Sequence, residues 1–467
     1  MPVTRDLPEP QRKMILKWLK NPVKKLEDID VRSIDDSSEV LPELKCDEPN
    51  HIAAVSMFEN FAKPPVCQAK AIPFNIQDYC KNFVDKYYFK TLKIPKSYYE
   101  LKNKNCPEDK RPLYNYKKNS KDPKIQGKCS EENLREQLQI GLKLELATIP
   151  IYITSLYSIG DGCNTQVYKT IRGILMQEML HLALVGNIIN AMNGGHPIID
   201  SPDVAPKYPS VGLPGCVHPS LNVHLKKISI KHIYDVPLVL EKPKLSCVTE
   251  DVYAELEDRH NTIGEFYTEI EECIEKLGQL KKEVFRPNKF QVSWPWKPSE
   301  ELGTLIEVKN TQTALEAIRE IKEQGEGASP IDPTVGHGAQ LGHYYQLMEI
   351  VCQKKLVKNE DDKHYSYSGA DIPFDSEGVW PMRDNPSKNC LTGNCYTEAR
   401  AFHTTYRKLL RELDATFGGE PERIKSAVTV MESLLVHGKR VMRVPLTPES
   451  EETCGPVWDY EWEERQN

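Results

Sequence analysis

One short segment constrains this chain more than any other. Glu178 and His181 stand three residues apart in IRGILMQEMLHLALVGNIINAMNGG, an otherwise apolar run. Positions i and i+3 share one face of a helix, and the apolar residues recur around that same face. A helix formed here therefore points an acid and an imidazole into a core. An ionised carboxylate is costly to bury unless it has a partner, and a metal ion is the natural partner.

Taken alone, the motif also fits a buried histidine that is satisfied by a backbone carbonyl. Three other segments favour the metal. SEENLREQLQIGLKLELATIPIYITSLYSI has Ser130 as a predicted N-cap, an apolar stripe that contains Glu145, and a kink expected at Pro150. HNTIGEFYTEIEECIEKL places Glu265 among apolar residues, and GHGAQLGHYYQLMEIVCQKKL places His343 on an apolar face. Four helices with inward acids and imidazoles are how ferritin-like carboxylate proteins hold iron or manganese.

The pattern departs from that scheme at one position. Gln340 stands three residues before His343, where a glutamate would complete the site. An amide is a neutral, weaker ligand and does not bridge two cations as a carboxylate does. His337, three residues further back, is either a replacement ligand or part of a loop. A single metal, an asymmetric pair and a weakened site are all compatible with this sequence.

Several further motifs occur in a fixed order along the chain: ELATIPIY, EMLHLALVGNIINAMNGGHP, YPSVGLPG, GHYYQLMEI and CGPVWDY. Together they resemble the ferritin-like domain of iminophenyl-pyruvate dimer synthases, the chromopyrrolate synthase group included, over about residues 130 to 460. That resemblance implies an inward constellation of Glu145, Glu178, His181, Glu265 and His343. It also implies an oxidative enzyme that couples two imine units from an aromatic amino acid, with haem involved.

The expected fold is therefore all-α, a ferritin-like helical bundle with long loop insertions. It should occupy residues 128–467, after an N-terminal extension over residues 1–127. Long insertions are expected at about 194–257 and 280–329. The first holds Glu241, an outlying candidate for a ligand or substrate contact, and a possible short strand or extra helix. The second holds Trp294 and Trp296, which would line a pocket or pack over the bundle end. Residues 396–417 and 421–438 should form an antiparallel helix pair.

Composition narrows the partners. A net charge of −7 and a pI near 6.0 argue against nucleic acid as a general partner. The basic, tyrosine-rich stretch over residues 81–128 is interpreted as an arm lying across an acidic body. No stretch approaches 18 consecutive apolar residues, so no membrane span is expected. The first residues lack a signal-peptide core, which indicates the cytoplasm. With nucleic acid and membrane not expected, the predicted partner is a small-molecule substrate.

Thirteen cysteines are scattered along the chain without a Cys-x-x-Cys pair, so a zinc finger or thioredoxin-like site is not expected. Cys390 and Cys395 are the closest pair and would permit a disulfide in an oxidising compartment. In a cytosolic protein free thiols are expected instead. Cys273 and Cys352 fall on predicted helices and are interpreted as core packing.

These observations predict a metal-dependent oxidoreductase acting on a small metabolite. One or two ions of iron or manganese would be held by carboxylate, imidazole and amide groups, because these ligands suit those metals and leave positions open for oxygen. The predicted metal ligands are Glu145, Glu178, His181, Glu265, His343 and Gln340. Two alternatives stay open: a haem-dependent coupling enzyme with axial histidines, and a non-catalytic ferritin-like protein whose metal site is weakened by Gln340.

Overall fold

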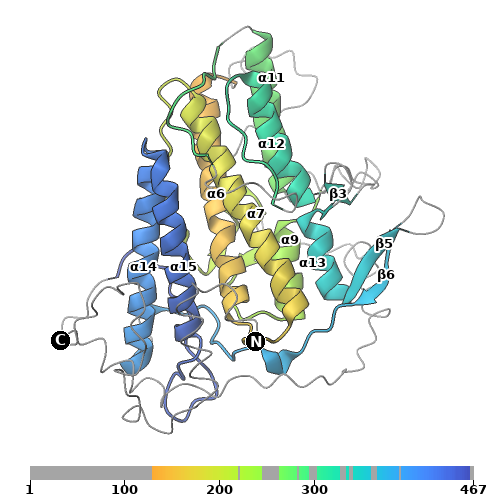
Figure 1. The fold of residues 1–467 in the computed structure, drawn as a ribbon, viewed down its shortest axis with the longest axis vertical. Coiled ribbons are helices and arrows are strands. Elements are labelled where there is room, and N and C mark those ends of the chain that lie inside the picture. Colours follow the sequence, from red (N-terminus) through yellow and green to blue (C-terminus); the bar gives the residue numbers. More distant parts are fainter. Residues whose placement is uncertain are drawn as a thin grey trace, which may run out of the picture.

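Long helices dominate the computed structural model of this protein (Figure 1). The structure describes residues 129–218, 221–243, 262–280, 283–293, 302–326, 333–335, 340–358, 365–388 and 391–462. The proposed N-terminal extension, His337, Trp294 and Trp296 lie outside these ranges, and the predictions for them stay predictions.

Two antiparallel helices form the centre, α6 (Glu131–Tyr157) and α7 (Thr165–Ala191). Ser130 caps α6 as predicted, because its hydroxyl accepts a hydrogen bond from the Asn133 amide. The helix continues through Pro150 for a further seven residues. From Gly141 onward nearly every α6 residue is buried, and α7 is buried to the same degree towards its C-terminus. Both helices are therefore core elements over these stretches.

A second layer covers one side of this pair. It contains α11 (Ile263–Gln279), α12 (Thr311–Glu326) and the shorter α13 (His343–Cys352). Helix α11 packs against α6 and α12, while α12 and α13 both pack against α7 (Figure 1). Two predictions are corrected here. The segment over residues 280–329 contains the regular helix α12, and the predicted fourth helix begins only at His343.

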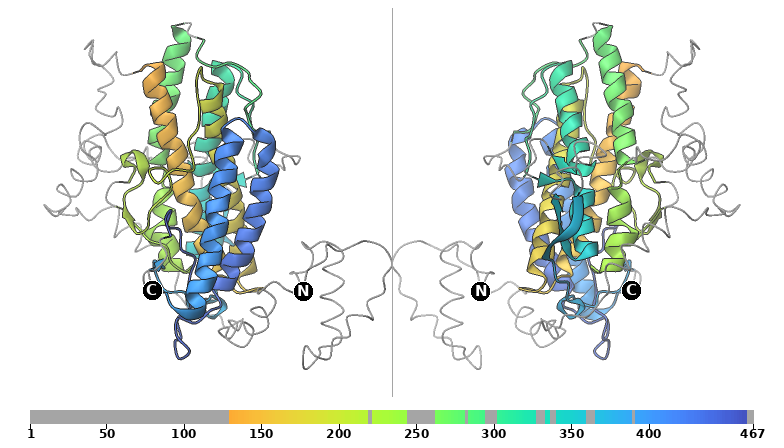
Figure 2. Two further views of the ribbon diagram at one scale, coloured as in Figure 1. Left: turned by 90° about the vertical axis from the view of Figure 1, so that its left-hand side faces the viewer. Right: turned by 90° about the vertical axis from the view of Figure 1, so that its right-hand side faces the viewer.

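A helix pair covers the other side. Helices α14 (Gly393–Phe417) and α15 (Ile424–Val441) are joined through the 3₁₀ turn η8 (Pro421–Arg423), and they pack against each other as predicted. The long helices run roughly along one axis (Figure 2). Two glycines allow the helix pair to pack closely against α6 and α7. A Cβ atom at Gly186 would collide with the Phe417 ring, and one at Gly438 would collide with the Tyr157 ring.

Short elements fill the connections. The segment after α7 holds β1 (Ser210–Val211), η5 (Pro214–Cys216), β2 (Asn222–Val223), α8 (Ile230–Asp235) and α9 (Pro237–Leu240). A short strand or an extra helix was expected there, and the segment contains both kinds of element. Strand β3 (Thr334–Val335) pairs with β4 (Gln340–Leu341), and β5 (Lys354–Lys358) pairs with β6 (Tyr365–Asp371); all three strand pairs are antiparallel. A further 3₁₀ turn, η6 (Ser376–Gly378), follows β6. The predicted all-α bundle with long insertions is confirmed.

Two disulfides link described residues that lie far apart in the sequence, which corrects the expectation of free thiols. Cys129–Cys273 ties the start of α6 to α11, with 5.5 Å between the Cα atoms. Cys395–Cys454 ties α14 to the C-terminal segment, with 5.9 Å between the Cα atoms. Both separations lie within the usual range for a disulfide. Cys352 is buried, in agreement with the packing role predicted for it.

Among the described residues, one helix is long and apolar enough to cross a membrane, namely α7. The most apolar window of α7 is 89% buried against the rest of the protein. A central helix of a soluble bundle meets the same criterion, and the position of α7 between two helical layers accounts for its composition.

Candidate metal centre

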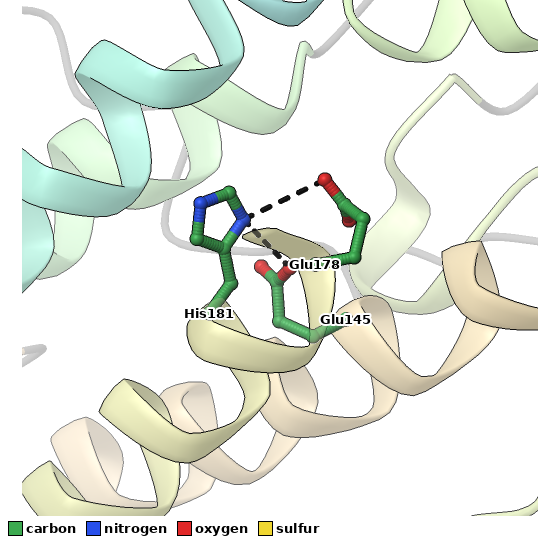
Figure 3. Close-up of side chains that lie close together, drawn as sticks. All are labelled: Glu145, Glu178 and His181. Atoms are coloured by element: carbon green, nitrogen blue, oxygen red, sulfur yellow. Dashed lines mark ion pairs between the residues drawn. The ribbon is translucent and has the colours of Figure 1, made fainter. Parts of the chain in front are cut away.

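Three acidic and basic side chains from the two central helices meet in the core (Figure 3). Glu145 comes from α6, and Glu178 and His181 come from α7. The Nδ1 atom of His181 lies 3.5 Å from Glu145 Oε2 and 3.6 Å from Glu178 Oε1. The i, i+3 spacing therefore does what the sequence predicted, because it directs both α7 side chains to the same point.

A second group shares Glu178 with the first. His343, the first residue of α13, places its Nδ1 atom 3.0 Å from Glu178 Oε1 and 3.4 Å from Glu241 Oε2. Glu241 is the C-cap residue of α9. The rings of His181 and His343 are stacked with 5.6 Å between their centroids. Glu178 therefore stands between two imidazoles, and one carboxylate flanks each side.

All five of these side chains are buried. His343 is fully buried, and the most exposed of the five, Glu241, is only 5% accessible. Three hydroxyl groups hold the carboxylates from behind. Tyr267 on α11 donates to Glu145, Tyr152 on α6 donates to Glu241 Oε1 at 2.6 Å, and Thr148 on α6 donates to Glu178 Oε2 at 2.6 Å.

The outer nitrogens of the two imidazoles are also occupied. His181 Nε2 lies 2.9 Å from Gln324 Oε1, and His343 Nε2 lies 3.0 Å from Gln177 Oε1. An amide oxygen only accepts, so each imidazole donates its Nε2–H outward. The Nδ1 atoms then face the carboxylates from both sides.

The donor set fits a metal ion. Glu145, Glu178 and His181 each offer one ligand atom within 4.8 Å of the others, and so do Glu178, Glu241 and His343. The Nδ1 atom of His343 is buried and makes no hydrogen bond in the structure, although carboxylate oxygens surround it. Carboxylate oxygen and imidazole nitrogen together suit iron, manganese and zinc. A shared carboxylate between two such groups is the arrangement expected for a pair of ions.

The comparison with protein families agrees with this geometry. Residues 138–352 match the family model described as ferritin-like. The fold of this part of the chain is therefore ferritin-like. The matched range includes every residue of both metal-compatible groups. No curated protein matches the chain. Among solved structures, a ferritin-like protein from Caulobacter vibrioides aligns at 22% identity with a TM-score of 0.47, covering 68% of this chain and 97% of that one. The narrower resemblance to iminophenyl-pyruvate dimer synthases stays a prediction.

The pKa values of the carboxyl and imidazole groups in this site differ from their ordinary values. Burial raises the pKa of Glu145. Burial would also raise the pKa of Glu178, but the two imidazoles outweigh it and the pKa of Glu178 is lowered. The pKa of His181 is raised, since Glu145 and Glu178 outweigh the effect of burial. Burial likewise opposes charge on His343, yet the carboxylates of Glu241 and Glu178 raise its pKa to about 10. Without metal, protonated imidazoles therefore act as counter-ions for the carboxylates.

The structure brings together four of the six predicted ligands: Glu145, Glu178, His181 and His343. Glu265 lies elsewhere. Its carboxylate accepts from the Thr262 amide, while the Thr262 hydroxyl accepts from the Glu265 amide, so the pair forms the capping box of α11. Helix α11 reaches the site through Tyr267, two residues later. Coordination of a metal by the four assembled residues stays a prediction.

Gln340 also differs from its predicted place. Helix α13 begins at His343 with Gly342 as its N-cap, so Gln340 belongs to β4 and not to a helical turn before His343. The three-residue spacing therefore does not put the two side chains on one helix face. Gln340 instead accepts a hydrogen bond from Gln177 at 3.2 Å.

The second carboxylate beside His343 is that of Glu241, which the sequence indicated only as an outlying candidate. It follows a proline-rich connection, where no helical period could place it. The supporting residues Tyr152, Tyr267, Gln177 and Gln324 were not predicted either. Each lies on an apolar helix face, and a polar group at such a position is the one signal that would have identified them.

Proposed function

We propose that this protein is a metal-dependent oxidoreductase that uses its ferritin-like centre to oxidise a small molecule. The observation that carries the proposal is the shared carboxylate. Oε1 of Glu178 faces the Nδ1 atoms of His181 and His343, and a further glutamate stands beside each imidazole. A fully buried set of this kind is costly without a cation, which favours metal binding over a purely structural role.

Each residue has a defined task in this proposal. Glu145 and His181 would hold one ion, Glu241 and His343 a second, and Glu178 would bridge them. Iron or manganese bound by such ligands supplies electron transfer and activation of dioxygen or peroxide. Tyr267, Tyr152 and Thr148 keep the carboxylates oriented. Burial of the whole set excludes bulk water, which strengthens every electrostatic interaction inside the site.

The ring environment argues against haem at this place. A haem iron binds an axial histidine that projects from the protein onto the face of the macrocycle. His181 and His343 are buried, and both nitrogens of each ring face protein groups. The proposal therefore assigns these histidines to non-haem metal. Oxidative coupling of an amino-acid-derived imine is the finer reaction that the sequence resemblance suggests.

The test is metal analysis and an absorption spectrum of the full chain, before and after anaerobic addition of ferrous iron. We expect one or two ions per chain, no strong band near 400 nm, and oxygen consumption by the ferrous protein. Glu178→Gln should lose the metal and the oxygen consumption together.

The matched control is Glu398→Gln. Glu398 is equally buried, but it pairs with Arg440 and belongs to neither metal group. It should keep the wild-type metal content. Absence of metal from the wild type, after reconstitution with either iron or manganese, would overturn the proposal. Metal uptake without any oxygen consumption would favour the non-catalytic alternative.

A further inference from the structure

We infer that Gln177 and Gln324 are positioning residues that aim the Nδ1 atoms of His343 and His181 at the metal. The inference rests on the proposed function and goes beyond it, because it concerns how the imidazoles are oriented and not which residues bind. Both glutamines are buried, with 1% of each accessible. Neither can serve as a counter-ion, so their burial calls for another reason.

The orientation of Gln324 is fixed by a neighbour on α12. Its amide nitrogen donates to Glu320 Oε1 at 2.8 Å, one helical turn earlier. A carboxylate oxygen only accepts, so the amide nitrogen must face Glu320 and the amide oxygen must face His181. The loop before α12 closes over this pair at Gly303, where φ is +83° and a Cβ atom would collide with both side chains.

Gln177 on α7 contacts His343 with the same end of its amide, although its outer partner is another amide and not a carboxylate. Its amide oxygen lies 3.0 Å from His343 Nε2, and its amide nitrogen donates to Gln340 Oε1 at 3.2 Å. Gln340, predicted as a ligand, is thereby one step further out, behind the residue that holds the imidazole. The two imidazoles come from different helices, yet each meets the same kind of partner.

The consequence is a defined choice of ligand atom. An acceptor at Nε2 keeps the proton there, so Nδ1 presents its lone pair to the metal. Metal-binding histidines often donate instead to a carboxylate, which adds negative charge. Here the acceptors are neutral, and the negative charge in this centre is confined to Glu145, Glu178 and Glu241. The glutamines therefore set the direction of the imidazoles without changing the charge balance.

The experiment titrates cobalt(II) into the metal-free full chain and follows its visible absorption. We expect Gln177→Leu and Gln324→Leu to weaken cobalt binding by about 10-fold or more. The control is Gln291→Leu. Gln291 is also buried, but its amide bridges the backbone N–H and C=O of Val308, and it belongs to neither metal group. Its loss should lower the melting temperature and leave the cobalt affinity unchanged.

A second readout reports the orientation directly. Histidines bound to cobalt through Nδ1 retain an exchangeable Nε2–H whose proton signal the metal shifts far from the protein envelope. The wild type should show two such signals that exchange slowly, because each proton is hydrogen-bonded in the core. Each leucine variant should lose one of them or exchange it much faster, which a general loss of stability in the Gln291→Leu control should not do.

Gln177→Glu provides the conservative rescue. A carboxylate still accepts from His343, and the Gln340 amide can rotate to donate to it, so cobalt affinity should stay within a few-fold of wild type. Equal affinity and two slow protons in all the leucine variants would overturn the inference. A wild type that takes up no cobalt would instead overturn the proposed function on which it rests.

Discussion

At the scale of single residues, protonated imidazoles supply the positive charge that balances the buried carboxylates when no metal is bound. Glu178 keeps a lowered pKa because His181 and His343 face it, and both imidazoles have raised pKa values. The phenol groups of Tyr152 and Tyr267 have pKa values well above their usual range, through burial first and the adjacent carboxylates second, so they remain donors. Metal binding must displace the imidazole protons, and it should become tighter as pH rises.

The stability of the metal-free protein should therefore fall with rising pH. His343 has a folded pKa of about 10, above its ordinary value near 6.5. Between these values the folded state holds a proton that the unfolded state has released, so the free energy of unfolding decreases as pH rises. The contribution is complete below pH 6.5 and lost through about pH 10, at roughly 1 kcal/mol per pH unit. Urea unfolding of wild type and His343→Gln from pH 6 to 10 measures it; a constant difference between the two would contradict it.

Tyr152→Phe should destabilise the metal-free protein by about 1–3 kcal/mol, because it removes the hydroxyl that donates to the buried carboxylate of Glu241. Tyr406→Phe is the matched control, since the buried Tyr406 hydroxyl makes no hydrogen bond to any described residue and its removal should cost little. Denaturant unfolding of both variants checks this. Equal losses would show that the Tyr152 hydroxyl contributes nothing specific.

At the scale of elements, the parts of the site that depend on helical period were predictable and the rest were not. Glu145, Glu178 and His181 lie within long helices, where spacing fixes the face. His343 was placed correctly as an inward residue, but Gln340 was not, because Gly342 starts the helix between them. Glu241 enters from a connection whose path is set by tertiary packing. Periodicity carries no information about such a segment.

Glu265 shows the same limit in another form. An acid among apolar residues at a helix start fits both an inward ligand and a cap, and the structure uses it as the cap of α11. Glu265→Ala should lower the free energy of unfolding by about 0.5–2 kcal/mol while leaving metal content unchanged. Metal analysis beside thermal unfolding separates these roles. A loss of metal comparable with that of Glu178→Gln would return Glu265 to the ligand set.

At the scale of the whole molecule, the candidate metal centre lies where the central pair α6 and α7 meets α13 and the connection that carries α9. Helices α6 and α7 supply Glu145, Glu178 and His181, while α9 and α13 supply Glu241 and His343. The disulfide Cys129–Cys273 joins the start of α6 to α11, which carries Tyr267. The cross-link therefore fixes the helix that orients Glu145. Paired cysteines are typical of oxidising compartments, and the cytoplasmic location stays a prediction.

Reduction should accordingly loosen the bundle. The bond closes a span of 144 residues, and constraint of the unfolded chain by so long a loop is worth about 2–5 kcal/mol. Thermal unfolding with and without reductant should show a lower melting temperature in the reduced wild type. Without reductant, the double variant Cys129→Ser, Cys273→Ser should melt below the wild type. Reductant should lower its melting temperature by less than it lowers that of the wild type, because Cys395–Cys454 is still present in the variant. Peptide mapping after alkylation without reduction decides the premise. If Cys129 and Cys273 are both alkylated in the native protein, the bond is absent and the expected loss of stability on reduction cannot come from it.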